Sequence, residues 1–103
     1  MVKVTKRIAE QRLGDVSEEK RFWCQDGLVL KSLPELESAL KAMKEDTFRH
    51  HVSEIRNDFR NWVRDVIGDE KLANDLSKSK TKTHAAKSVA DRITWLKSKI
   101  TAG

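Results

Sequence analysis

The sequence predicts a mainly α-helical protein, a single compact bundle of four to five helices with a short β-hairpin near Asp26-Gly27. Apolar residues recur every three to four positions over most of the chain, which is the period of an amphipathic helix. Turn formers are scarce, with four glycines and one proline in 103 residues. The length fits one domain, and the regular apolar positions indicate a folded chain although 36% of the residues are charged.

The N-terminal arm, residues 1–19, is only weakly predicted, and we expect the helical domain itself to span residues 20–103. Thr5 is placed to cap a short helix that ends at Gly14. Few apolar residues accompany this pattern, so an arm that orders only on a partner is an equal expectation.

The hairpin is predicted by Asp26-Gly27, which lies between two apolar runs, residues 22–24 and 28–30. An Asp-Gly pair in this setting is a strong signal for a tight turn between antiparallel strands. Because a lone hairpin is marginally stable in water, we expect it to lie against the helices, with Trp23 as an anchor at the border of the core.

Capping residues mark the remaining helices. Ser32 starts the first of them, and Glu35 three residues later completes a capping box. The predicted spans are Ser32 to about Lys44, Thr47–Ile67 capped by Asp46 and ended by Gly68, Glu70–Ser77 capped by Asp69, and His84–Ile100 capped by Thr83. The side chains expected to form most of the core are Leu36, Leu40, Phe48, Phe59, Trp62, Ile93 and Leu96.

The predicted central helix, Thr47–Ile67, carries three kinds of side chain on separate stripes. Its apolar face is formed by Phe48, Val52, Ile55, Phe59, Trp62, Val63 and Val66. One edge of that face carries the arginine row, Arg49, Arg56, Arg60 and Arg64. The other edge carries His51, Glu54, Asp58 and Asp65. We therefore expect one unbroken helix with a covered apolar face and an arginine row that is open to solvent.

The arginine row suits a polyanion, because guanidinium groups bond phosphates in a bidentate manner and repeat here about every 6 Å along a helix. Alternate lysines of the basic linker before the last helix, Lys78, Lys80 and Lys82, extend the basic surface. The net charge of +5 and the pI near 9.5 agree with such a ligand. The sequence thus predicts a non-enzymatic basic module that contacts nucleic-acid phosphates. The alternative is a solvated face whose arginines pair with acids of neighbouring helices.

Trp95 is the basis of a second hypothesis. It falls opposite the buried face of the last helix, with Arg92 and Lys99 beside it. An exposed tryptophan among cations indicates a contact surface for a partner protein, a stacked base or a second copy of the chain. The alternative function is therefore protein interaction or self-assembly through this helix face, unless the N-terminal arm covers Trp95.

His51 and Asp58 form the nearest approach to a chemical site, since their spacing places them on one edge of a helix. An imidazole beside a carboxylate can act as an acid–base pair, and with Glu54 it can begin a metal site. A purely structural hydrogen bond explains the same spacing. No nucleophile motif or second ligand cluster accompanies the pair, so we predict no enzyme, no catalytic residue, no metal and no cofactor.

Cys24 is the single cysteine, which excludes an internal disulfide and a multi-cysteine metal site. We find no secretory signal and no apolar run long enough to span a bilayer. These features predict a cytoplasmic protein without a membrane partner.

Two stretches of the sequence resemble an uncharacterised family of small helical domains that is frequent in archaea. The resemblance covers residues 20–97 and is carried by Phe22, Asp26-Gly27, the run Lys31-Ser32-Leu33-Pro34-Glu35-Leu36, Phe48, His51, Asn57-Asp58-Phe59, Trp62, and Val66-Ile67-Gly68-Asp69 with Leu72-Ala73. It implies a helical fold. The family has no assigned activity, so the resemblance supplies no catalytic residues.

Overall fold

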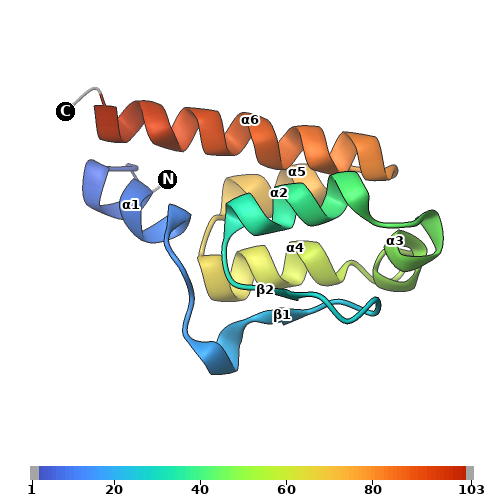
Figure 1. Ribbon diagram of the computed structural model, residues 1–103. Coiled ribbons are helices and arrows are strands. Elements are labelled where there is room, and N and C mark those ends of the chain that lie inside the picture. Colours follow the sequence, from blue (N-terminus) through green and yellow to red (C-terminus); the bar gives the residue numbers. More distant parts are fainter. Residues whose placement is uncertain (1–2, 102–103) are drawn as a thin grey trace.

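A computed structural model describes residues 3–101, which form a mainly α-helical fold with a small antiparallel hairpin (Figure 1). The predicted fold class, mainly α-helical with a short hairpin, is confirmed, and residues 3–101 contain six α-helices where four to five were predicted. The elements in chain order are α1 (Lys6–Leu13), the 3-10 turn η1 (Glu18–Lys20), β1 (Phe22–Trp23), β2 (Val29–Leu30), α2 (Leu33–Ala42), α3 (Glu45–His51), α4 (Asp58–Trp62), the π-helical turn η2 (Val63–Ile67), α5 (Glu70–Ser77) and α6 (Lys82–Thr101).

The helices are stacked between α6 on one side of the molecule and the hairpin on the other (Figure 1). Helices α2 and α5 lie beneath α6, α4 lies between them and the hairpin, and α1 lies beside the C-terminal half of α6. Packing is most extensive between α2 and α6. The predicted core is confirmed, because all seven of its members are buried: Leu36, Leu40, Phe48, Phe59, Trp62, Ile93 and Leu96.

The N-terminal arm contains the helix that its capping pattern predicts. Thr5 Oγ1 accepts a hydrogen bond from the backbone N–H of Ile8 at 3.3 Å, and α1 ends at Gly14. Ala9 is fully buried, and α1 packs on α6. The arm therefore contributes to the same core as the rest of the described chain.

The hairpin forms around Asp26-Gly27, with Phe22 paired to Leu30 and Trp23 paired to Val29. The Cys24 N–H donates to the Leu28 carbonyl at 2.8 Å, so the loop between them has three residues, and Gly27 closes it with a φ of +95°, which favours glycine. The inner face of the hairpin packs on the helices through Phe22, whose ring lies 5.1 Å from that of Phe59. Tertiary contact thus stabilises a pair of strands that is too short to persist alone.

The prediction of one continuous helix over residues 47–67 is wrong. Helix α3 ends at His51, and Val52 takes an extended conformation with φ −129° and ψ 117°. Residues 53–56 form a loop that is closed by an antiparallel bridge between Val52 and Asn57. As a result Ile55, which was predicted on the buried face, is 97% exposed.

A helix start at Asn57 explains this break. The Asn57 side chain accepts a hydrogen bond from the backbone N–H of Arg60 at 3.0 Å, and Asp58 follows in the first turn. Asparagine favours caps over helix interiors because its side chain competes for backbone hydrogen bonds. The local capping preference therefore outweighs the apolar period that runs through residues 47–67.

Other helix ends agree with their predicted caps. Ser32 Oγ accepts from the Glu35 N–H at 3.4 Å, and Glu35 Oε1 accepts from the Lys31 N–H at 3.0 Å. Asp69 caps α5 as predicted, and Gly68 ends η2 with a left-handed φ of +84°. Two helix starts differ from their predicted positions. Helix α3 begins at Glu45, one residue before Asp46. Helix α6 begins at Lys82, because its cap is Thr81 instead of Thr83: Thr81 Oγ1 accepts a hydrogen bond from the His84 N–H.

Candidate binding groove

The arginine row is divided by the loop at residues 53–56. Arg49 lies on α3, where its Nε is 3.9 Å from a carboxylate oxygen of Glu45. Arg60 lies on α4 and is half-buried, and its Nε donates to the side-chain carbonyl of Asn61 at 3.1 Å. The continuous edge that the sequence predicted is therefore absent from the described chain.

The other two members of the row pair with adjacent acids. Arg56 Nη2 lies 2.7 Å from Asp58 Oδ2, and Arg64 Nε lies 2.8 Å from Asp65 Oδ1. The hydrogen bond from Arg64 lowers the pKa of Asp65, so this acid stays ionised and offsets the arginine charge. The row therefore presents less positive charge than its residue types suggest.

The predicted lysine linker is shorter than expected. Lys82 belongs to α6, and its Nζ donates to the backbone carbonyl of Met43 at 2.6 Å. Lys78 and Lys80 are exposed. A hydrogen bond from Asn57 to the last turn of α5 brings the start of α4 to the helix end from which these two lysines follow.

His51 and Asp58 lie together, as their spacing predicted, but within the packed core. His51 Nδ1 donates to Asp58 Oδ2 at 2.9 Å, and His51 Nε2 accepts from the backbone N–H of Gln25 at 3.0 Å. The imidazole packs against Phe22 and Phe59, with ring centres 5.1 and 5.2 Å away. Both ring nitrogens are engaged, which favours the structural interpretation of the pair over acid–base work.

Asp58 is held as a carboxylate. Burial raises its pKa, but hydrogen bonds from Arg56 and His51 outweigh this effect, so the net pKa is lowered. Among residues 3–101, no three His, Cys, Asp or Glu side chains converge closely enough to hold a metal ion.

A broad groove with a volume of about 1080 Å³ lies where α1, α5 and α6 meet. We call it the Trp95 groove. Trp95 on its wall is 39% exposed, with Arg92 Cζ 4.3 Å and Lys99 Nζ 4.7 Å from its ring centre. The residues that line it are Lys3, Val4, Arg12, Arg64, Gly68, Glu70, Lys71, Asn74, Asp75, Ser88, Asp91, Arg92, Trp95 and Lys99.

A buried ion cluster includes two residues that line the groove, Arg12 and Arg92, and sequence reasoning missed it. We call these two largely buried arginines the groove floor. Asp69 is fully buried; its Oδ1 accepts from the Leu72 N–H, and its Oδ2 accepts from Arg92 Nε at 2.8 Å. Arg12 Nη1 lies 3.7 Å from the same oxygen. Arg92, which was predicted on an exposed partner-binding face, is therefore a buried residue that joins α6 to α5.

The groove carries more positive than negative charge. Two of its cations pair with adjacent acids, Arg64 with Asp65 and Lys71 with Asp75, and Asp91 pairs with Lys87 outside the groove. The charges that remain are four groove-lining cations, Lys3, Arg12, Arg92 and Lys99, one groove-lining carboxylate, Glu70, and the buried carboxylate of Asp69 next to Arg92. This imbalance favours an anionic ligand.

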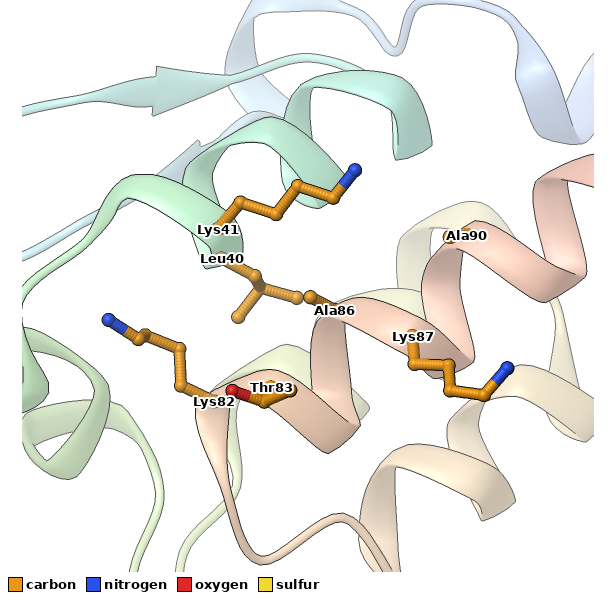
Figure 2. A pocket seen from close by; sticks show the side chains of 7 residues that line it. All are labelled: Leu40, Lys41, Lys82, Thr83, Ala86, Lys87 and Ala90. Carbon is orange, nitrogen blue, oxygen red and sulfur yellow. The ribbon is translucent and has the colours of Figure 1, made fainter.

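A second cavity of about 320 Å³ lies between the end of α2 and the start of α6 (Figure 2). Its apolar floor is formed by Leu40, Ala86 and Ala90. Figure 2 shows three lysine side chains around it whose ammonium groups point away from the floor and from one another. Lys41 and Lys87 pair with acids on their own helices, and Lys82 donates to a backbone carbonyl. This cavity is therefore less suited to an anion than the Trp95 groove.

The outer face of the hairpin exposes apolar side chains, which the sequence did not predict. Trp23, expected as an anchor of the core, is 73% exposed and lies opposite Val29 in the hairpin register. Leu28 beside them is also exposed. The alternation along β1 explains this result, because Phe22 faces the helices and its neighbour must face away.

Comparison with known proteins supplies no assignment: no family model, curated protein or solved structure matches this chain. The resemblance to an archaeal family of helical domains therefore stays a prediction. None of the helices within residues 3–101 combines the length and hydrophobicity needed to cross a bilayer.

Proposed function

We propose that this protein is a non-enzymatic module that binds a nucleic-acid strand along the Trp95 groove. The observation that carries the proposal is the pair of guanidinium groups, Arg12 and Arg92, that line the Trp95 groove and share one buried carboxylate. Phosphate contacts by arginine and lysine provide most of the affinity of such modules and carry little sequence preference.

The groove replaces the arginine row as the favoured contact surface. Arg64 is the single member of the row among the groove-lining residues, so it connects the two surfaces. The exposed Lys78 and Lys80 follow the other end of α5, where they are available to a strand that extends beyond the groove. The cytoplasmic location predicted from the single cysteine is part of this proposal.

Salt dependence tests the proposal directly. Fluorescence anisotropy with labelled single-stranded RNA, single-stranded DNA and duplex DNA is measured at 50 and 200 mM salt. Neutralising about three or four phosphates predicts a loss of affinity of about 20–50-fold for single strands and about 40–150-fold for duplex DNA over this range. If none of the three probes binds at 50 mM salt, the proposal is wrong.

Charge reversals then locate the surface. We expect Lys99→Glu, in the groove, to weaken binding about tenfold, whereas Lys41→Glu on α2 changes it less than about threefold. Arg49→Glu and Lys80→Glu test the predicted row and linker in the same way. An equal loss from Lys41→Glu would show a diffuse charge effect instead of a groove.

Self-association is the second candidate function, and the hairpin favours it. Trp23, Leu28 and Val29 expose an apolar face, whereas the ring of Trp95 already has Arg92 and Lys99 over it. A hairpin-mediated dimer predicts a mass by light scattering that rises with concentration and returns to the monomer value in Trp23→Ser. A monomer at all concentrations would reject it.

A further inference from the structure

The floor of the Trp95 groove has an uncompensated positive charge. The guanidinium groups of Arg12 and Arg92 both lie next to the carboxylate of Asp69. One carboxylate balances the charge of only one guanidinium group. Both arginine side chains are largely buried, with 11% and 9% of their surface exposed. Burying a cation without a partner is costly, so an anion that enters the groove would recover part of that cost.

Hydrogen-bond donors remain free for such an anion. Arg92 uses its Nε for Asp69, which leaves its two terminal amino groups without a protein partner among residues 3–101. Arg12 stands 3.7 Å from Asp69, beyond hydrogen-bonding distance. The Trp95 ring holds the Arg92 guanidinium from one side at 4.3 Å. Two oriented guanidinium groups are a geometry that suits the oxygens of a phosphate.

The charge of this pair favours a particular kind of phosphate. An internal phosphodiester carries a single negative charge and two free oxygens, so it offers two guanidinium groups less charge and fewer acceptor atoms. A terminal phosphate has three free oxygens and a charge of about −1.5 to −2 at neutral pH. That charge matches Arg12, Arg92 and the nearby Lys99 better than a single charge does.

We infer that the groove floor binds a terminal phosphate group through Arg12 and Arg92, with Lys99 as a third cation. The inference rests on the proposed function, because the strand end is taken to lie in the same groove. A phosphomonoester on a free nucleotide has the same chemistry, and the experiment below separates the two sources.

The carboxylates that line the groove allow a matched test of this inference. Asp75 and Asp91 are paired with Lys71 and Lys87, so Glu70 is the remaining groove-lining carboxylate without an ion pair in the described chain. It is exposed at the start of α5, and its removal leaves the core untouched. Glu70→Gln should therefore strengthen phosphate binding, whereas loss of Arg12 should abolish it.

The experiment compares one ten-nucleotide strand in two forms, with a 5′-phosphate and with a 5′-hydroxyl. We expect the phosphorylated form to bind about tenfold tighter, as one or two added charge-assisted hydrogen bonds would give. Arg12→Gln should reduce this ratio to about one, and Glu70→Gln should raise it about threefold. Glu10→Gln, an exposed acid on α1 outside the groove, is the control that should leave the ratio unchanged.

The outcomes separate the inference from the proposed function. Equal affinity for the two strands, in the wild type and in Glu70→Gln, would overturn the inference and leave strand binding intact. If neither strand binds but a nucleoside 5′-monophosphate raises the melting temperature of the wild type and not of Arg12→Gln, the phosphate site stands and the proposed function fails. If no probe binds, both are wrong.

Discussion

The imidazole of His51 fastens the end of α3 to the tip of the hairpin, because its Nε2 accepts a hydrogen bond from the backbone N–H of Gln25 at 3.0 Å. Thr47 reinforces this contact through a hydrogen bond of 3.3 Å from its Oγ1 to the Gln25 side chain. The other ring nitrogen donates to Asp58 at the start of α4. An acceptor at Nε2 and a donor at Nδ1 require the neutral ring with its proton on Nδ1.

Loss of His51 should therefore loosen three segments at once. We expect His51→Ala to lower the free energy of unfolding by about 2–4 kcal/mol, because it removes two hydrogen bonds and leaves a cavity between aromatic rings. Urea denaturation followed by circular dichroism measures the change. The exposed neighbour provides the control: His50→Ala should stay within about 0.5 kcal/mol of the wild type. An equal effect of both substitutions would contradict the proposed role of the ring.

Asp58 should make folding sensitive to acid. Its pKa is lowered in the folded protein, so its stabilising contribution is fully present above the unfolded-state pKa of about 3.9 and is lost as the pH falls through the folded-state value. We expect Asp58→Asn to be less stable than the wild type by about 1–2 kcal/mol at pH 6. The difference should shrink between pH 5 and pH 2 in urea denaturation. Asp65 forms an exposed pair with Arg64, so Asp65→Asn should differ little from the wild type in unfolding free energy at both pH 6 and pH 2.

Asp69 should be the most sensitive acidic position of the fold. It caps α5 and is the one carboxylate beside two arginines, Arg12 of α1 and Arg92 of α6, in a buried setting. We expect Asp69→Ala to lower the free energy of unfolding by about 3–5 kcal/mol, because it leaves buried guanidinium charge without a carboxylate partner and removes the cap of α5. Asp69→Asn keeps an oxygen that can cap α5 but removes the negative charge. If Asp69→Asn loses nearly as much unfolding free energy as Asp69→Ala, most of the loss is due to the charge. A mild effect of Asp69→Ala would show that the cluster is dispensable.

Elements with strong local signals could be predicted from the sequence. Thr5, Ser32, Asp69 and Asp26-Gly27 each set a cap or a turn through contacts with residues at most a few positions away. The break before α4 had such a signal as well, in Asn57 followed by Asp58, but the apolar period that continues across it masked the signal. In the fold the local cap outweighs the long periodic pattern, and the hydrogen bond that the Gln25 N–H donates to His51 holds the end of α3 against the hairpin.

The groove could be predicted only in part. Trp95 and Lys99 were identified because both lie on the face of α6 opposite its apolar stripe. The pairing of Arg12 and Arg92 through Asp69 joins residues 57 and 23 positions apart from the acid, and no spacing rule connects residues on three separate helices. Charge pairs of this kind emerge from packing, which is why Arg92 looked exposed by sequence and is buried in the fold.

Cys24 should be an inert thiol despite its place near the exposed hairpin tip. Burial, followed by the negative charge of Asp26, raises its pKa to about 11. The folded state favours the protonated thiol, so this stabilisation is present below the unfolded-state pKa of about 8.5 and is lost as the pH rises toward 11. We expect Ellman's reagent at pH 8 to react about 100-fold more slowly with the native protein than with the urea-unfolded chain. Asp26→Asn should leave most of this protection, because burial is the larger cause; equal rates for native and unfolded protein would show that the thiol is accessible.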